Sequence, residues 1–220
     1  MTTSNEIKAL INGCAGRIGA NQFAAALLQN KLQNIVLVND IVEIEDVAFI
    51  WLYEIPARHQ HLIKSISVEK GVNGGFIIVN GHRIRYTQCA NPADIPCGEV
   101  GVNLVLEATG RHKDFAACEV FVNQGLKVVI SAPSKDEQVQ RIVIGINDAS
   151  YDPSYKVSSN TSCSTNCTAQ GVSVFADVFS PKAMLMVAPH AATASQRTLA
   201  CGKIGGGVDV GALEDASPAS

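Results

Sequence analysis

Residues 7–30 read IKALINGCAGRIGANQFAAALLQN, and the order of residue types in this segment decides the fold. The apolar run over residues 7–11 is typical of a buried strand, because it is short and a glycine soon follows it. Three glycines stand at positions 13, 16 and 19. Beyond them Phe23 and Leu27 are four residues apart, so they share one face of a predicted helix that the alanines between them keep slim.

A second apolar run, NIVLVND over residues 34–40, ends in Asp40, 21 residues after Gly19. A strand, a glycine turn, a helix, a strand and a terminal acid make up a dinucleotide-binding unit. Gly13, Gly16 and Gly19 would let the backbone approach a pyrophosphate, and Asp40 would accept hydrogen bonds from a ribose. The spacing G-x-x-G-x-x-G is one residue longer than usual, so a simple tight turn stays open as the alternative.

The next hundred or so residues alternate between predicted strands and helices, which is typical of an α/β fold with a parallel sheet. We predict helices over 43–53 and 112–125, a hairpin over 74–87 around Asn80-Gly81, and strands within 101–110, 126–133 and 141–147. The carboxyl ends of parallel strands line the ligand crevice. Thr109, Gly110 and Ser131 are therefore candidate cofactor contacts, although each taken alone is better explained as a strand-to-loop junction.

The segment SSNTSCSTNC, residues 158–167, surrounds Cys163 with small polar residues, whereas a structural cysteine packs as a small hydrophobe among apolar neighbours. A helix is predicted over 167–179, so Cys163 lies at or just before a helix N-terminus. There the helix N–H groups and a nearby histidine would lower a thiol pKa from about 8.5 to about 3.5–7.5. Cys167, one helical turn later, is expected to pack in the core.

His190 follows an apolar run over 183–189 that predicts a strand, and it precedes a polar cluster that contains Thr193. A histidine alone is more often structural than catalytic. A reactive cysteine in the same half of the chain changes this interpretation, because a Cys–His pair is the minimal activated nucleophile. We therefore predict that Cys163 and His190 act together.

The composition excludes several classes of protein. The 220 residues are 47% hydrophobic and 17% charged with a net charge of −3, which disfavours nucleic acid or an anionic membrane as the partner. No apolar run approaches the roughly 18 residues of a membrane span, and the N-terminus lacks a signal-peptide pattern, so a cytoplasmic location is predicted. Seven cysteines without a C-x-x-C pair predict neither a disulfide framework nor a zinc site.

With these residues assembled, the chain resembles the phosphorylating glyceraldehyde-3-phosphate dehydrogenase family. SAPSKD is identical to a family segment, and SSNTSCSTNC is similar to the family's S-N-A-S-C-T-T-N-C. Further segments of similar sequence are INGCAGRIG (11–19), VNDIVEIED (38–46), NPADIPCGEVGVNLVLEATG (91–110) and PHAATASQ (189–196). The resemblance implies a Rossmann-type NAD-binding domain over residues 1–162, followed over 163–220 by the start of an α+β catalytic domain.

The resemblance also implies the site residues and the reaction. Cys163 would be the nucleophile and His190 its base, and Cys163 would carry a thioester that inorganic phosphate cleaves. The substrate would be a small phosphorylated aldehyde, glyceraldehyde 3-phosphate, and the protein a homotetramer. By the same resemblance NAD would contact Arg17, Ile18, Asp40, Thr109, Gly110 and Ser131, and substrate or phosphate would lie near Ser162, Ser164 and Thr193.

The chain departs from the family pattern in four places. The glycine loop has its extra residue, Cys89-Ala90 replaces a Glu-Arg pair, KIGGGVDVGA (203–212) replaces an arginine-bearing segment, and the chain ends at SPAS. Because phosphate sites need cationic side chains, we expect weak NAD binding and little phosphorylating activity from the 220 residues. The alternatives are a catalytically compromised paralogue or fragment that binds nucleotides or other subunits, and an erythrose-4-phosphate dehydrogenase.

Overall fold

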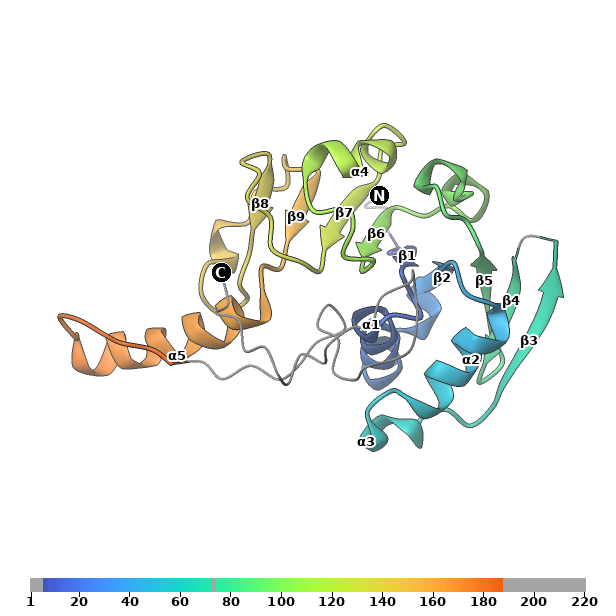
Figure 1. Ribbon diagram of the computed structural model, residues 1–220, viewed down its shortest axis with the longest axis horizontal. Helices are drawn as coiled ribbons and strands as arrows, with labels where there is room; N and C mark the ends of the chain where they lie inside the picture. The colour runs from blue at the N-terminus through green and yellow to red at the C-terminus, as the bar shows by residue number, and fades with distance from the viewer. Residues whose placement is uncertain (1–5, 73, 188–220) are drawn as a thin grey trace, which may run out of the picture. The chain divides into compact units, whose positions relative to one another are not determined.

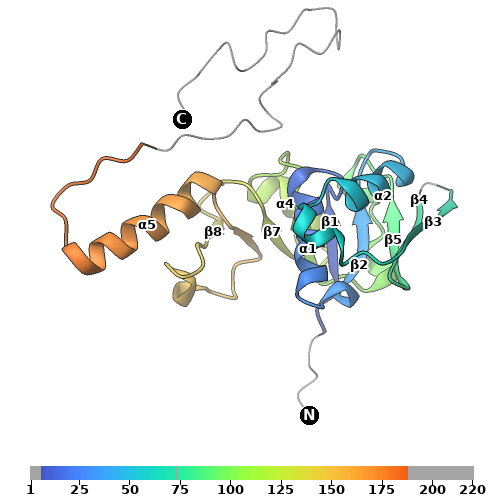
Figure 2. The same ribbon diagram turned by 90° about the horizontal axis from the view of Figure 1, so that it is seen from below.

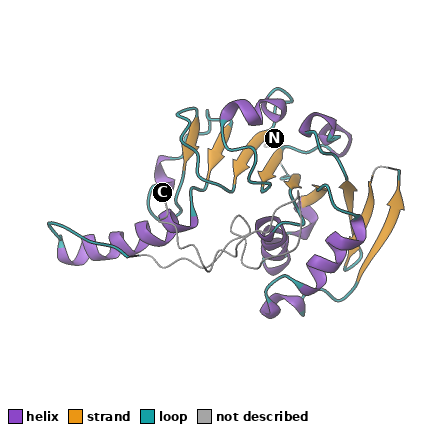
Figure 3. Ribbon diagram, in the orientation of Figure 1, coloured by secondary structure: helices purple, strands orange, loops and turns teal. Residues whose placement is uncertain are grey.

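The structure is a computed structural model that describes residues 6–72 and 74–187. Helices and strands are interspersed along the chain (Figures 1 and 3). The strands are β1 (Ala9–Asn12), β2 (Ile35–Asn39), β3 (Ile66–Gly71), β4 (Gly74–Val79), β5 (His82–Thr87), β6 (Leu104–Glu107), β7 (Lys127–Ile130), β8 (Val139–Arg141) and β9 (Val157–Ser159). The α-helices are α1 (Arg17–Leu28), α2 (Ile44–Tyr53), α3 (Ala57–Gln60), α4 (Phe115–Val122) and α5 (Cys163–Phe179). The 3-10 turns are η1 (Leu32–Asn34), η2 (Pro92–Asp94), η3 (Cys97–Val100) and η4 (Asp148–Ser150).

The described strands form one sheet in the order β3-β4-β5-β2-β1-β6-β7-β9-β8. From β5 to β8 every neighbouring pair is parallel. The strand order reverses at β1, which has β2 on one side and β6 on the other, and open α/β sheets bind ligands at such a switch point. The fold is therefore the Rossmann-type α/β fold that the sequence predicts.

Strands β1 and β2 send residues to two separate hydrophobic cores. Ile11 of β1 and Val38 of β2 pack in the core that α1 and α2 cover, while Leu10 and Leu37 pack in the core that includes α4. Figures 1 and 2 show α1 and α2 on one face of the sheet and α4 on the other. Because both faces are covered, these strands read as continuous apolar runs.

Most of the predicted elements are confirmed. The hairpin of β4 and β5 turns at Asn80 and Gly81, whose φ angles of +53° and +81° are typical of a type I′ turn. The strand predicted over 141–147 is wrong, because β8 ends at Arg141 and the chain then turns through Gly145, which has a φ of +82°. The strand predicted over 183–189 is also wrong where the structure describes it: residues 183–187 form no strand.

The chain divides into two compact units, Met1–Ser173 and Val174–Ser220, and α5 crosses from the first into the second. The sheet, both cores and every residue that lines the pocket at the ends of β1, β2 and β6 belong to the first unit. The domain boundary that we predict at residue 162 stays a prediction. In the part of the chain that the structure describes, no helix is both long and apolar enough to cross a bilayer.

Candidate cofactor and nucleophile site

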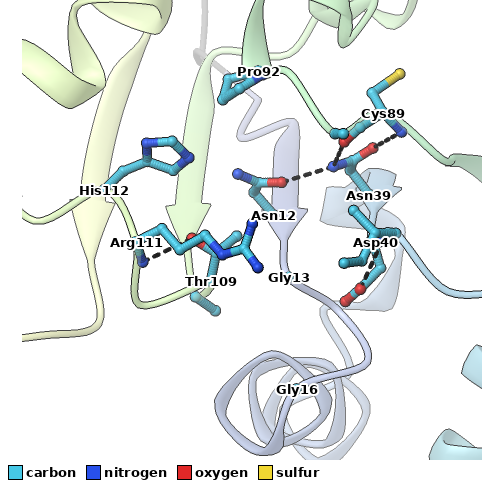
Figure 4. Close-up of a pocket in the computed structure, with 13 residues that line it drawn as sticks. Asn12, Gly13, Gly16, Asn39, Asp40, Cys89, Pro92, Thr109, Arg111 and His112 are labelled. Atoms are coloured by element: carbon cyan, nitrogen blue, oxygen red, sulfur yellow. Dashed lines mark hydrogen bonds between the residues drawn. The ribbon is translucent and has the colours of Figure 1, made fainter. Parts of the chain in front are cut away.

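A pocket lies at the carboxyl edge of the sheet, where β1, β2 and β6 end side by side (Figure 4). Parallel strands bring their carboxyl ends to one edge, so residues from distant parts of the chain meet there. Four of the predicted cofactor residues line this pocket: Gly13, Gly16, Asp40 and Thr109. The full lining is Asn12, Gly13, Gly16, Asn39, Asp40, Ile41, Cys89, Ala90, Pro92, Ala108, Thr109, Arg111 and His112.

The three glycines of the loop after β1 have different structural roles. Gly13 turns the chain with a φ of +88°, and a Cβ there would lie 2.8 Å from the backbone nitrogen of Thr109. A Cβ on Gly19 would overlap the Gly13 carbonyl oxygen, so this glycine lets α1 pack against the loop. A Cβ on Gly16 would meet only ordinary contacts, the nearest at 3.4 Å. Gly16 faces the pocket, where a missing side chain allows a ligand to approach the backbone.

The extra loop residue is accommodated by burying Cys14. Its side chain is fully buried, and its carbonyl oxygen accepts a hydrogen bond of 3.0 Å from the indole nitrogen of Trp51. Trp51 itself stacks on Phe23 of α1 with 3.7 Å between ring centroids. Burial raises the pKa of the Cys14 thiol well above its usual value, and the nearby Asp40 carboxylate raises it further. Cys14 is therefore a structural residue that anchors the longer loop.

Asp40 joins the loop to the end of β2. One carboxylate oxygen accepts a hydrogen bond of 2.8 Å from the Ala15 N–H, and the other accepts one of 2.8 Å from the Ile41 N–H. A carboxylate has about four lone-pair positions, so about two remain for the hydroxyl groups of a ribose. Gly16, which has no side chain, is the N-cap of α1 and presents the helix N-terminus to an anion. These residues fit an adenine dinucleotide.

A buried polar network supports the floor of the pocket. Glu107, 1% exposed, accepts a hydrogen bond of 2.7 Å from the side-chain amide of Asn12 at one carboxylate oxygen. Its other oxygen accepts from both the N–H (2.8 Å) and the hydroxyl of Thr109. Asn39 donates to the Asn12 oxygen at 2.9 Å and to the Cys89 carbonyl at 3.0 Å. The network fixes four strand ends around one cavity, and no motif of the sequence marks it.

Two further residues of the lining, Arg111 and His112, are also absent from the predicted site. Both come from the loop between β6 and α4, and Figure 4 shows them on the wall that faces Cys89 and Asp40. Cys89 lines the pocket with a thiol whose pKa is raised by partial burial. The pocket thus has a cationic side chain opposite the Cys89-Ala90 pair.

The other predicted NAD residues lie outside this lining. Ser131 follows β7 and donates its N–H and its hydroxyl to the Glu107 carbonyl, at 2.9 and 2.8 Å. Gly110 is exposed with a φ of +69°, between two lining residues. Arg17 lines a separate cavity with Asn21 and Glu54, and Ile18 is 50% exposed on α1.

Cys163 is the first residue of α5, so it lies at a helix N-terminus as predicted, although the helix begins four residues before the predicted start at residue 167. The preceding turn is held by Asn166, whose side-chain amide donates to the carbonyls of Asn160 (2.7 Å) and Ser162 (2.9 Å). The Ser162 hydroxyl accepts from the Thr165 N–H at 3.0 Å, which caps the helix. Thr161 has a φ of +63°, which is a strained value for a β-branched residue. Such strain persists where surrounding hydrogen bonds fix the backbone, and it concentrates at functional sites.

The cysteines differ sharply in their surroundings. Cys163 and Cys167 are exposed, so the prediction that Cys167 packs in the core is wrong. Burial raises the pKa of Cys97 to about 11 and that of Cys118 to about 12. Ser164 follows Cys163 in the first turn of α5, whereas His190 and Thr193 lie outside the described residues. Within the described ranges no three His, Cys, Asp or Glu side chains cluster as metal ligands would.

Comparison with known proteins agrees with this geometry. Residues 7–115 match the family model described as glyceraldehyde 3-phosphate dehydrogenase, NAD binding domain. The chain is 40% identical over 195 residues to glyceraldehyde-3-phosphate dehydrogenase of Streptomyces coelicolor. This alignment covers 88% of this chain and 56% of the relative. It is 37% identical over 148 residues to the enzyme of Geobacillus stearothermophilus (67% of this chain, 42% of the relative). For the cytosolic enzyme of Trypanosoma brucei brucei the identity is 35% over 194 residues (88% and 56%).

The chain spans about half the length of these relatives, 42–56%. The matched segment begins at β1 and ends at the start of α4, so it contains the glycine loop, Asp40 and Thr109. The family match supports NAD as the cofactor, and the pocket at the ends of β1, β2 and β6 is the candidate site for it. With its NAD-binding domain, the chain belongs to the glyceraldehyde-3-phosphate dehydrogenase family.

Proposed function

We propose that the protein is a phosphorylating aldehyde dehydrogenase that converts glyceraldehyde 3-phosphate and inorganic phosphate to 1,3-bisphosphoglycerate, with NAD as the oxidant. The observation that carries the proposal is the position of Cys163. An exposed thiol opens α5 directly after β9, and β9 is parallel to β7 in the sheet whose carboxyl edge forms the NAD pocket. Nucleophile and cofactor loops therefore arise from the same edge.

The proposed reaction assigns a role to each protein group. The Cys163 thiolate, favoured by the partial positive charge of the α5 N-terminus, attacks the aldehyde carbon and forms a hemithioacetal. His190 would accept the hydroxyl proton as the hemithioacetal is oxidised to a thioester. Bound NAD supplies the hydride acceptor for that oxidation. A phosphate oxygen then attacks the thioester carbon, and the carbon–sulfur bond breaks to return the Cys163 thiolate and release the acyl phosphate.

Three further assignments belong to the same proposal. Ser162 and Ser164 flank the nucleophile and would contact substrate or phosphate, together with Thr193. A homo-oligomer, in family terms a tetramer, and a cytoplasmic location are proposed from the family membership and from the Trypanosoma relative, which is named as cytosolic. Oxidation of erythrose 4-phosphate would use the same Cys–His chemistry. Turnover measurements with each of the two sugar phosphates distinguish these possible substrates.

Selective alkylation tests the proposed nucleophile. We expect iodoacetate at pH 7 to carboxymethylate Cys163 about tenfold faster than Cys167, because only Cys163 lies at the helix N-terminus, where thiolate is favoured. Peptide mass spectrometry over time gives both rates. Cys14, Cys97 and Cys118 provide internal controls, because burial raises the pKa of each and should leave them unlabelled.

The variant Cys167→Ser should leave the carboxymethylation rate of Cys163 unchanged, because the two thiols are expected to react independently. Equal rates for Cys163 and Cys167 in the wild-type chain would contradict an activated nucleophile. They would favour the alternative of a nucleotide-binding module without catalysis.

A further inference from the structure

The charges around the NAD pocket are unevenly distributed. Its lining contains the Asp40 carboxylate on the β2 side, and Arg111 is the only arginine or lysine among the lining residues. On the β5 side Cys89 and Ala90 contribute no charge. The diphosphate of a dinucleotide carries two negative charges, and sites for such groups use guanidinium groups and backbone N–H groups together. The lining offers the diphosphate one guanidinium.

The backbone of Arg111 is held in place by the buried network. Its N–H donates to the Thr109 hydroxyl oxygen at 3.1 Å, and Thr109 is fixed by two hydrogen bonds to Glu107. Gly110 supplies the left-handed turn between them, with a φ of +69°. The loop therefore presents the side chain of residue 111 from a fixed point at the end of β6.

The side chain of Arg111 extends toward the glycine loop. Figure 4 shows it running from the β6–α4 loop toward Gly13, across the pocket. Throughout residues 6–72 and 74–187, no side chain or carbonyl forms a hydrogen bond or ion pair with this guanidinium. All five of its N–H donors are therefore available to an anion.

We propose that Arg111 binds the diphosphate of NAD, from the wall opposite the N-terminus of α1. This assignment rests on the proposed use of the pocket for NAD and names a binding residue that the motifs of the sequence do not contain. A planar guanidinium can take two phosphate oxygens at once, while the Gly16 side of the pocket offers backbone N–H groups.

Calorimetric titration of the 220-residue chain with NAD, ADP-ribose, adenosine and NADP tests the proposal. The variant Arg111→Gln should raise the Kd for NAD and for ADP-ribose about tenfold, since one charge-assisted interaction is lost. The Kd for adenosine, which has no phosphate, should be unchanged. Arg111→Lys should give an intermediate Kd, because an ammonium keeps the charge but loses the bidentate geometry. The dependence of the NAD Kd on salt concentration should also be weaker in Arg111→Gln.

Lys113→Gln is the matched control, because it removes one positive charge two residues away, outside the pocket lining. It should change the Kd for NAD by less than about twofold, since exposed charges are screened by salt. An equal loss for Lys113→Gln, or an equal loss of adenosine binding by Arg111→Gln, would overturn the assignment. A selective loss of NADP binding would overturn it in favour of a 2′-phosphate contact. Failure of the wild-type chain to bind any of these ligands would instead contradict the NAD pocket itself.

Discussion

Gly19→Ala is expected to destabilise the NAD-binding domain by about 3 kcal/mol or more, the upper part of the range for overpacked sites. The added Cβ would overlap the Gly13 carbonyl oxygen and lie 2.8 Å from the Cα of Cys14. All of these are backbone atoms, so no flexible side chain can move aside. The loop or α1 must shift, and either shift disturbs the buried Cys14 and its contact with Trp51. Urea unfolding followed by far-UV circular dichroism measures the change.

Gly171→Ala in α5 is the control, because it makes the same substitution inside a helix where no described atom lies within 4 Å of the new Cβ. Alanine should there stabilise the helix by up to about 1 kcal/mol, since glycine is the poorer helix former. The two substitutions are thus expected to have opposite signs. A Gly19→Ala variant within about 0.5 kcal/mol of the wild type would show that α1 does not pack against the loop as described.

Glu107→Leu is expected to reduce the free energy of unfolding by about 3–5 kcal/mol. The leucine has a similar volume, but it leaves the Asn12 amide and the Thr109 N–H without their acceptor in a buried setting. Each unsatisfied buried donor costs about 1–3 kcal/mol. Glu119→Ala, on the exposed surface of α4, should change stability by no more than about 0.5 kcal/mol. Chemical unfolding of both variants provides the comparison.

A double-mutant cycle identifies the network as the cause. Asn12→Leu combined with Glu107→Leu removes donor and acceptor together, so the double variant should be more stable than the sum of the single losses predicts by about 1 kcal/mol or more. Strictly additive losses would mean that the hydrogen bond between Asn12 and Glu107 contributes nothing to stability. Because Asn12 and Thr109 also line the pocket, both single variants should weaken NAD binding as well.

The sequence predicts those parts of the fold that depend on local patterns. The apolar runs before Gly13 and Asp40 and the Asn80-Gly81 turn are each set by neighbouring residues, and the structure confirms them. The helix predicted over 167–179 is also present, but it begins at Cys163. The strand predicted over 141–147 has the right apolar composition but the wrong position. The strand that forms nearby, β8, ends at Arg141 and pairs with β9. Strand β9 has only three residues, and no local pattern marks them as a strand. Pairing partners of short edge strands are set by tertiary contacts.

The candidate site likewise contains residues that the sequence predicts and residues that it does not. Gly13, Gly16, Asp40 and Thr109 follow directly from motif and strand-end reasoning, and they meet at one pocket. The network beneath them joins Asn12 to Glu107, which are 95 residues apart, so spacing alone could not pair them. One sequence pattern could have indicated the network: β1, β2 and β6 are apolar runs that each end in a polar residue. No such pattern marks Arg111, because the direction of its side chain depends on the path of the loop between β6 and α4.

The central claim is that NAD binds at the carboxyl edge of the sheet, between the glycine loop and the β6–α4 loop. Nuclear magnetic resonance of the ¹⁵N-labelled chain, titrated with NAD, tests it most directly. We predict that the largest amide shifts fall on Gly13, Gly16, Asp40, Thr109 and Arg111. A second cavity, which Lys127, Tyr151 and Lys156 help to line, should show none. Largest shifts at that second cavity, with the glycine loop unperturbed, would contradict the account.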